Sequence, residues 1–142
     1  MAIIQTLTTS FKVELAQGLH NFTTGTGDVF KLALYTANAD LGASTTAYTT
    51  AGEVSGTNYS AGGIILTNIT PSFQGTTSYW SFQNATFTNV TLTTNGALIY
   101  NSTNGNRSVA VLNFGVNITK TAQDLVITFP VNDATNAVLR IA

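Results

Sequence analysis

The chain has 142 residues, of which 44% are hydrophobic and only 8% are charged, and its formal net charge is −1. A typical globular protein has about 25% charged residues. The polar surface is therefore built largely from 26 threonines and 14 asparagines. Five lysines and arginines, scattered along the chain, form no basic patch, which argues against binding to nucleic acid or to a membrane surface. There is no cysteine, and hence no disulfide or thiol chemistry.

The N-terminal segment predicts the only helix, over Thr9–Gln17. Ser10 is its predicted cap, Glu14 lies near the first turn, where a carboxylate suits the helix dipole, and Gly18 ends it. The apolar face of this helix is predicted from Phe11, Leu15 and Leu19. The start of the chain has no basic leader and too short an apolar run for a signal peptide. Residues 1–21 are expected to be a helix that plugs one end of the domain or an arm that grips a neighbour.

The first clear strand is the alternating run Val29–Thr36. Its alternation predicts that Lys31 and Tyr35 lie on the face opposite the core. The core face is predicted from Phe30, Leu32 and Leu34. The stretch Ala37–Gly63 that follows is small and polar, with several glycines, and is expected to be a surface loop that contacts a partner.

The rest of the chain predicts a series of short strands separated by turns. Pro71 and Gly115 are expected to interrupt strands, Asn95-Gly96 to form a turn and Asn104-Gly105 to form the tip of a hairpin. The strands are expected at Ile64–Ile69, Ser78–Phe82, Phe87–Leu92, Ala97–Tyr100, Arg107–Phe114, Asp124–Phe129 and Ala137–Ile141. About eight short antiparallel strands with one helix favour an all-β fold, a β-sandwich or jelly roll, with residues 1–142 as a single domain.

Residues that could carry catalysis are few. The one histidine, His20, directly follows the predicted end of the helix, and no nucleophile elbow is present, so a surface or helix-terminus role is expected. The six carboxylates are Glu14, Asp28, Asp40, Glu53, Asp124 and Asp133, and no two of them have helical or strand-face spacing. Asp28 and Asp133 lie among turn residues, where capping or turn roles are expected. The sequence therefore predicts no catalytic, cofactor-binding or metal-binding residues, and no enzyme.

Two weaker patterns also occur in the sequence. Gly25-Thr26-Gly27-Asp28 is similar to a fragment of a phosphate loop, but it precedes a strand and lacks the Lys-Ser/Thr pair. Tyr79 and Trp80 would form a sugar-stacking platform if one ring were exposed, and alternation predicts one ring inside the fold and one outside.

Several stretches together resemble a family of small virion structural proteins of tailed bacteriophages. They are Phe30–Thr36, Leu41–Tyr48, Glu53–Gly63, and the C-terminal half from Gly96–Asn101 to Ala137–Ala142. The resemblance implies a capsid decoration (cement) protein or a tail-associated component, and it brings no active-site residues. Its expected location is the capsid surface of the virion, after assembly in the host cytoplasm.

The main hypothesis is a decoration protein that binds the major capsid protein and stabilises the head. It is expected to self-associate as a homodimer or homotrimer. The expected contact regions are Ala2–Asn21 and Ala37–Gly63. The alternative hypothesis is a tail or fibre component. Such a component could also recognise host glycans. An enzyme acting on polysaccharide is a third hypothesis, which would require two carboxylates about 5–10 Å apart in a cleft.

Overall fold

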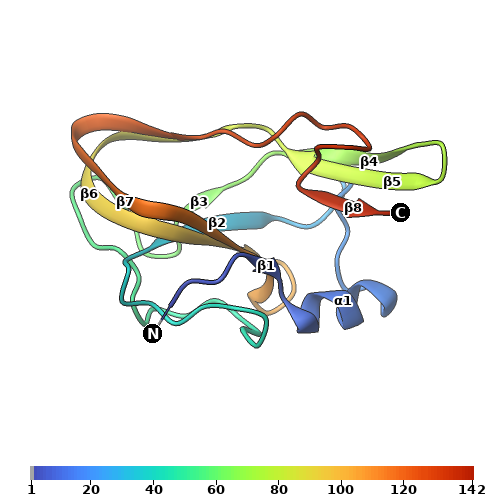
Figure 1. Ribbon diagram of the computed structural model, residues 1–142, viewed down its shortest axis with the longest axis horizontal. Coiled ribbons are helices and arrows are strands. Elements are labelled where there is room, and N and C mark those ends of the chain that lie inside the picture. The colour runs from blue at the N-terminus through green and yellow to red at the C-terminus, as the bar shows by residue number, and fades with distance from the viewer. Residues whose placement is uncertain (1) are drawn as a thin grey trace.

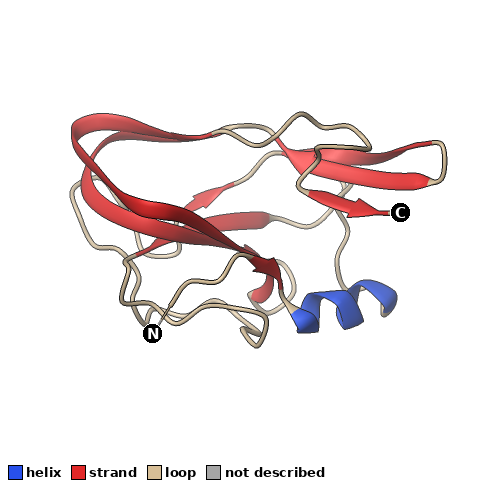
Figure 2. Ribbon diagram, viewed as in Figure 1, coloured by secondary structure: helices blue, strands red, loops and turns tan. Residues whose placement is uncertain are grey.

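The computed structural model describes residues 2–142, so Met1 of the predicted segment 1–21 lies outside the described residues. The fold is all-β, with two antiparallel sheets and one short helix, as predicted (Figure 1, Figure 2). The larger sheet has five strands in the order β1-β7-β6-β2-β3, and the smaller has three in the order β4-β5-β8. The elements are β1 (Thr6–Leu7), α1 (Thr9–Ala16), β2 (Phe30–Tyr35), β3 (Ile64–Ile65), β4 (Asn68–Gln74), β5 (Thr77–Phe82), β6 (Ala85–Asn101), β7 (Arg107–Ile127) and β8 (Leu139–Ile141).

The helix is where the sequence predicts it, but its capping differs. Thr8, not Ser10, is the N-cap, because the Thr8 hydroxyl accepts a hydrogen bond from the backbone N–H of Phe11 at 3.4 Å. Gly18 follows the C-cap with a φ of +72°, which confirms it as the end of the helix. The predicted dipole role of Glu14 is wrong, because the first turn holds no acidic residue and Glu14 is buried beyond it.

A long hairpin of β6 and β7 dominates the larger sheet, and here two predicted interruptions are wrong. Asn95-Gly96 lies inside β6, and Gly115 lies inside β7, which continues through the strand predicted to begin at Asp124. The hairpin absorbs these residues at bulges, including a register shift between Thr94 and Gly96 and a φ of +80° at Gly115. Its predicted tip at Asn104-Gly105 is confirmed, since β7 begins directly after it at Arg107.

The bulges let the hairpin curve. The end away from its tip, where Ala85 pairs with Ile127, therefore forms part of the upper layer in Figure 1, next to β4 and β5. Pro71 was also expected to interrupt a strand, but it lies within β4, at a register shift between Ile69 and Ser72. An edge strand tolerates proline at a bulge because no ladder hydrogen bond is needed from that nitrogen.

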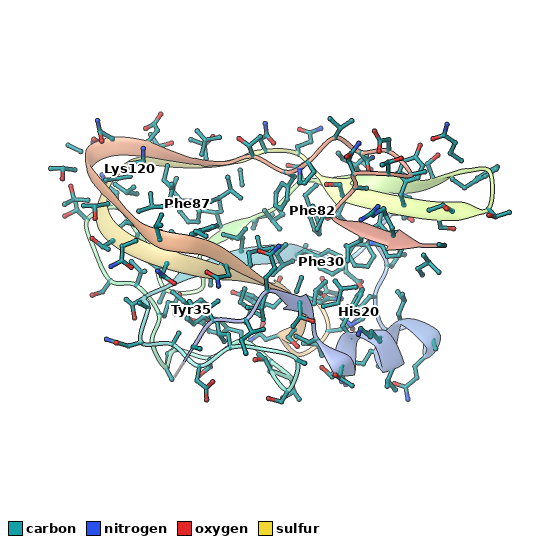
Figure 3. All side chains as sticks on the ribbon, in the orientation of Figure 1. His20, Phe30, Tyr35, Phe82, Phe87 and Lys120 are labelled. Atoms are coloured by element: carbon teal, nitrogen blue, oxygen red, sulfur yellow. The ribbon has the colours of Figure 1, made fainter. Side chains whose placement is uncertain are left out.

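The main core fills the space between the two layers. The predicted inward residues of β2 are confirmed, since Phe30, Leu32 and Leu34 are all fully buried. Phe30 stacks on Phe22 with ring centroids 4.3 Å apart, and Phe82 closes the cluster from β5 (Figure 3). Burial of these aromatic rings supplies much of the apolar stabilisation of the sandwich.

The opposite face of the larger sheet is also buried, which the sequence did not predict. A second cluster on that face consists of Ile3, Ala33, Tyr35, Ala39, Leu41, Leu98, Tyr100 and Val111, with Tyr48 packed against it. Tyr35 is on the face predicted for it, but it is fully buried rather than exposed. The segment 37–63 therefore does more than form a surface loop, because its apolar residues cover this side of the sheet.

Candidate functional site

The two segments predicted as contact regions lie side by side on one face of the molecule. Ile3 forms a parallel bridge with Leu41, and backbone hydrogen bonds run from Ile4 N to Leu41 O (2.9 Å) and from Leu41 N to the carbonyl of Ala2 (3.0 Å). We call the surface formed by residues 2–5 and 37–63 the loop face, which lies at the bottom of Figure 1. The fold thus joins two segments that are separated in sequence into one continuous candidate interface.

A broad depression of about 650 Å³ lies at the junction of these two segments. It is lined by Ile4 and by Asp40–Thr49. Ile4 is 62% exposed, although it is a large aliphatic residue. Asp40 is the one exposed charged side chain within the loop face. The depression therefore combines an exposed aliphatic side chain with hydroxyl and backbone groups, a composition suited to contact with another weakly charged protein surface.

Glu53 holds the loop face in shape through a cluster of tyrosines. Its carboxylate accepts hydrogen bonds from the hydroxyls of Tyr48 (2.5 Å) and Tyr59 (2.8 Å) and from the backbone N–H of Gly62 (2.7 Å). Tyr59 Oη in turn accepts a hydrogen bond from the backbone N–H of Leu34 in β2. One carboxylate thereby ties three points of the loop together, and one of them to the sheet beneath it.

The tyrosines beneath the loop face are shielded from water. Tyr100 donates to the carbonyl of Gly62 at 2.6 Å, and Tyr35 donates to the carbonyl of Thr49 at 2.6 Å. Burial, with the nearby charge of Glu53 as the second cause, raises the pKa of Tyr100 to about 12. Burial is also the largest cause that raises the pKa values of Tyr35, Tyr48 and Tyr59 above the ordinary tyrosine value. All four hydroxyls stay protonated, and so remain donors, at neutral pH.

His20 belongs to a second polar cluster, at the helix end of the fold. The expected surface position is wrong, because His20 is only 7% exposed (Figure 3). Its Nε2 lies 2.9 Å from Glu14 Oε1, and its Nδ1 lies 3.1 Å from Asn101 Nδ2. This pairing assigns a neutral ring that donates to Glu14 and accepts from Asn101. Both ring nitrogens are thus used in binding α1 to the end of β6.

The same cluster includes an ion pair and a turn carboxylate. Arg107 Nη1 donates to Glu14 Oε2 at 2.9 Å, which compensates the charge of the buried carboxylate. Asp28 accepts from the backbone N–H of Asn21 (2.9 Å) and from Asn101 Nδ2 (2.8 Å), so its predicted turn role is confirmed. The fold therefore brings Glu14 and Asp28 into one network through His20 and Asn101, although the sequence spacing gave no sign of it.

Changing Glu14 to glutamine is expected to lower the free energy of unfolding by about 1–3 kcal/mol. The variant keeps the shape of the side chain but loses the negative charge of the carboxylate, which accepts hydrogen bonds from both Arg107 and His20. Asp40→Asn removes an exposed carboxylate and is the matched control, with an expected change within about 0.5 kcal/mol. Urea denaturation of both variants measures the difference, and equal losses would contradict a structural role for the cluster.

The remaining predicted residues are placed as follows. Trp80 is inside the fold and Tyr79 is partly exposed, as alternation predicted, so Trp80 offers no exposed ring for stacking on a sugar. Asp133 accepts from the backbone N–H groups of Thr135 and Asn136 and from the Asn136 side chain, and these bonds lower its pKa. Gly27, in the glycine-rich segment, lies in a tight turn whose backbone N–H bonds Thr23 O at 2.9 Å.

Within residues 2–142, no group of three or more His, Asp or Glu side chains is arranged to hold a metal ion. Across the same described range, the one helix is too short to cross a membrane.

Sequence reasoning missed the Glu53 cluster. Its signal was present as two tyrosines, Tyr48 and Tyr59, and one glutamate within a segment otherwise rich in small polar residues, because bulky aromatic rings are usually shielded from water. No protein-family model matches the chain, and no curated protein or solved structure is significantly similar to it.

Proposed function

We propose that the chain is a structural protein of a tailed-phage virion, a capsid decoration protein that binds the major capsid protein through the loop face. The loop face carries the proposal. It is a continuous, nearly uncharged surface, fixed by the Glu53 cluster, with Ile4 exposed beside a depression. A surface that is already ordered loses little conformational entropy on docking, so even a modest contact area yields useful affinity.

In the proposed role, each modest contact would be repeated over the shell. A decoration protein is bound at many equivalent positions, and self-association about the local axes links those contacts by avidity. Threonine and asparagine side chains can satisfy hydrogen bonds across such an interface without the desolvation cost of buried charges. The proposed location is accordingly the outer surface of the capsid, with the chain arranged as a dimer or trimer.

The position in the virion tests the proposal. Quantitative gel analysis of purified particles is expected to give many copies per particle, and a map of the particle is expected to place them across the shell. A few copies at the tail would instead support the alternative, a tail or fibre component. Density confined to the tail would reject the decoration role.

Replacing Ile4 with lysine is expected to weaken binding to shells that lack the protein by about tenfold or more. The substitution puts a charge where an aliphatic side chain would be buried on docking, and tenfold corresponds to only about 1.4 kcal/mol. Val126→Lys is the matched control, since Val126 is 50% exposed on β7, outside the loop face. Co-sedimentation with the shells measures binding, and thermal unfolding checks that both variants are folded. Equal binding by the two variants would exclude Ile4 from the interface.

A further inference from the structure

The sandwich is open along one side, away from the loop face. The five-stranded sheet ends there in β1 and the three-stranded sheet ends in β8, and each of these edge strands is paired on one side alone. Within residues 2–142, no backbone hydrogen bond joins β1 to β8. We call this side, between β1 and β8 and above α1 in Figure 1, the seam.

Three hollows follow the seam, with volumes of about 460, 350 and 290 Å³, and Leu7 of β1 lines all of them. The largest is lined mainly by apolar side chains, among them Phe129 and Val138, and lies between β1 and the segment leading to β8. The smallest is also mainly apolar and lies between α1 and β8, where Phe11 and Leu139 line it. The hollows are thus a continuous series along two free strand edges rather than an isolated pocket.

One buried donor in the seam has no partner. Trp80 lines the hollow between α1 and β8 and is 4% exposed, and its indole N–H makes no hydrogen bond to any of the described residues 2–142. A buried N–H without an acceptor is costly, and such groups usually have a partner. A carbonyl or carboxylate oxygen brought into this hollow by a ligand would supply one.

The two charged side chains that line the hollows of the seam are both basic, and Asp133, the carboxylate that interacts with Arg140, does not line a hollow. Lys12 and Arg140 line the hollow between α1 and β8, and Arg140 also lines the middle hollow. The side chains that line the three hollows include no carboxylate. Arg140 is positioned by a hydrogen bond to the carbonyl of Thr135. This arrangement favours a ligand that carries negative charge.

We propose that the seam binds an extended, acidic segment of a partner protein. Its backbone would pair with the free edge of β1 or β8, its apolar side chains would fill the hollows beside Leu7, and a carboxylate would lie near Lys12 and Arg140. Adding a strand to an exposed sheet edge is an established mode of peptide recognition. This inference does not depend on the proposed capsid role, because Gln5 is the one loop-face residue among those that line the hollows of the seam.

Trp80 is the only tryptophan in the chain, so it reports directly on the seam. The probe is a short acidic peptide with blocked termini, in which valine alternates with threonine and aspartate. The control is a basic peptide of the same sequence with lysine in place of each aspartate. We expect the acidic peptide to change the Trp80 emission saturably, and to bind roughly tenfold more tightly than the basic one at low salt. Added salt is expected to reduce the difference in affinity between the acidic and the basic peptide.

The double variant Lys12→Glu, Arg140→Glu is expected to reverse the preference between the two peptides. Lys120→Glu is the charge-matched control, because Lys120 lies on β7 at the far end of the molecule, at the left of Figure 3. No saturable change with the acidic peptide, or equal affinity for both peptides, would overturn the proposal. Concentration-dependent self-association that alters the emission without peptide would overturn it in another way, since a second copy would then be the occupant.

Discussion

Gly63→Ala is expected to unfold the protein or to lower its free energy of unfolding by roughly 3 kcal/mol or more. Gly63 has a φ of +79°, and a Cβ there would lie 1.8 Å from the carbonyl oxygen of Leu32 and 2.8 Å from the Cα of Ala33. Both atoms belong to the backbone of β2, so no side-chain rotation can relieve the clash. The loop would have to separate from the sheet just where it enters β3.

Gly105→Ala is the control that separates the two effects expected for Gly63→Ala, the steric clash of the new Cβ and the strain of a positive φ. Gly105 has a similar φ of +68°, but a Cβ there would have no neighbour within 4 Å. Only the cost of the left-handed conformation remains, about 1–2 kcal/mol. Urea denaturation of both variants provides the comparison, and a similar loss in both would mean that the loop can move away from β2 at little cost. Since the loop face depends on that contact, a folded Gly63→Ala variant is also expected to lose the proposed binding to the shell.

The parts of the fold that the sequence predicts are those encoded by local pattern. Alternation alone identifies β2 and its inward residues Phe30, Leu32 and Leu34, because one face of that strand meets the main core. Asn104-Gly105 predicts the hairpin tip because few residue pairs adopt the turn so readily. In these places the local preference and the tertiary environment require the same structure.

Local pattern fails where tertiary contacts decide the outcome. Asn95-Gly96 has a good turn sequence, but Gly96 lies within β6. This position needs glycine because a Cβ there would lie 2.5 Å from Leu112 O and 2.9 Å from the Ile3 side chain. Close packing of three chain segments requires the glycine here, and in the sequence such a glycine cannot be distinguished from one required by a turn. Similarly, Gly115 serves a bulge within β7 rather than its end.

The candidate site could be predicted only in part. Composition predicts the two segments as candidate contact regions, but their position side by side depends on backbone pairing between Ile4 and Leu41, which no periodicity predicts. The cluster around His20 depends on contacts across still larger separations, with Arg107 93 residues from Glu14. A single charged residue has no sequence pattern that reveals its partner, so such networks become visible only in the folded chain.

Raising the pH above about 10 is expected to destabilise the protein steeply, beginning at the loop face. Tyrosine in an unfolded chain has a pKa of about 10, whereas burial raises the pKa of Tyr100 to about 12 and those of Tyr35 and Tyr59 further. The unfolded chain therefore releases protons that the folded chain retains. The stability is fully present below pH 10 and falls as the pH rises through 12, by at most about 1.4 kcal/mol per pH unit for each such tyrosine.

Single substitutions of the tyrosines distinguish this cause from general alkaline damage. Tyr100→Phe is expected to lose some stability at neutral pH, because the carbonyl of Gly62 loses its donor, but to show a shallower decline above pH 10. Tyr79→Phe, outside the Glu53 cluster, is expected to keep the wild-type profile. Urea midpoints measured from pH 8 to 12 test both statements. Parallel profiles for all the variants would show that the shielded tyrosines do not set the alkaline limit, and that the loop face opens in water more readily than its hydrogen bonds suggest.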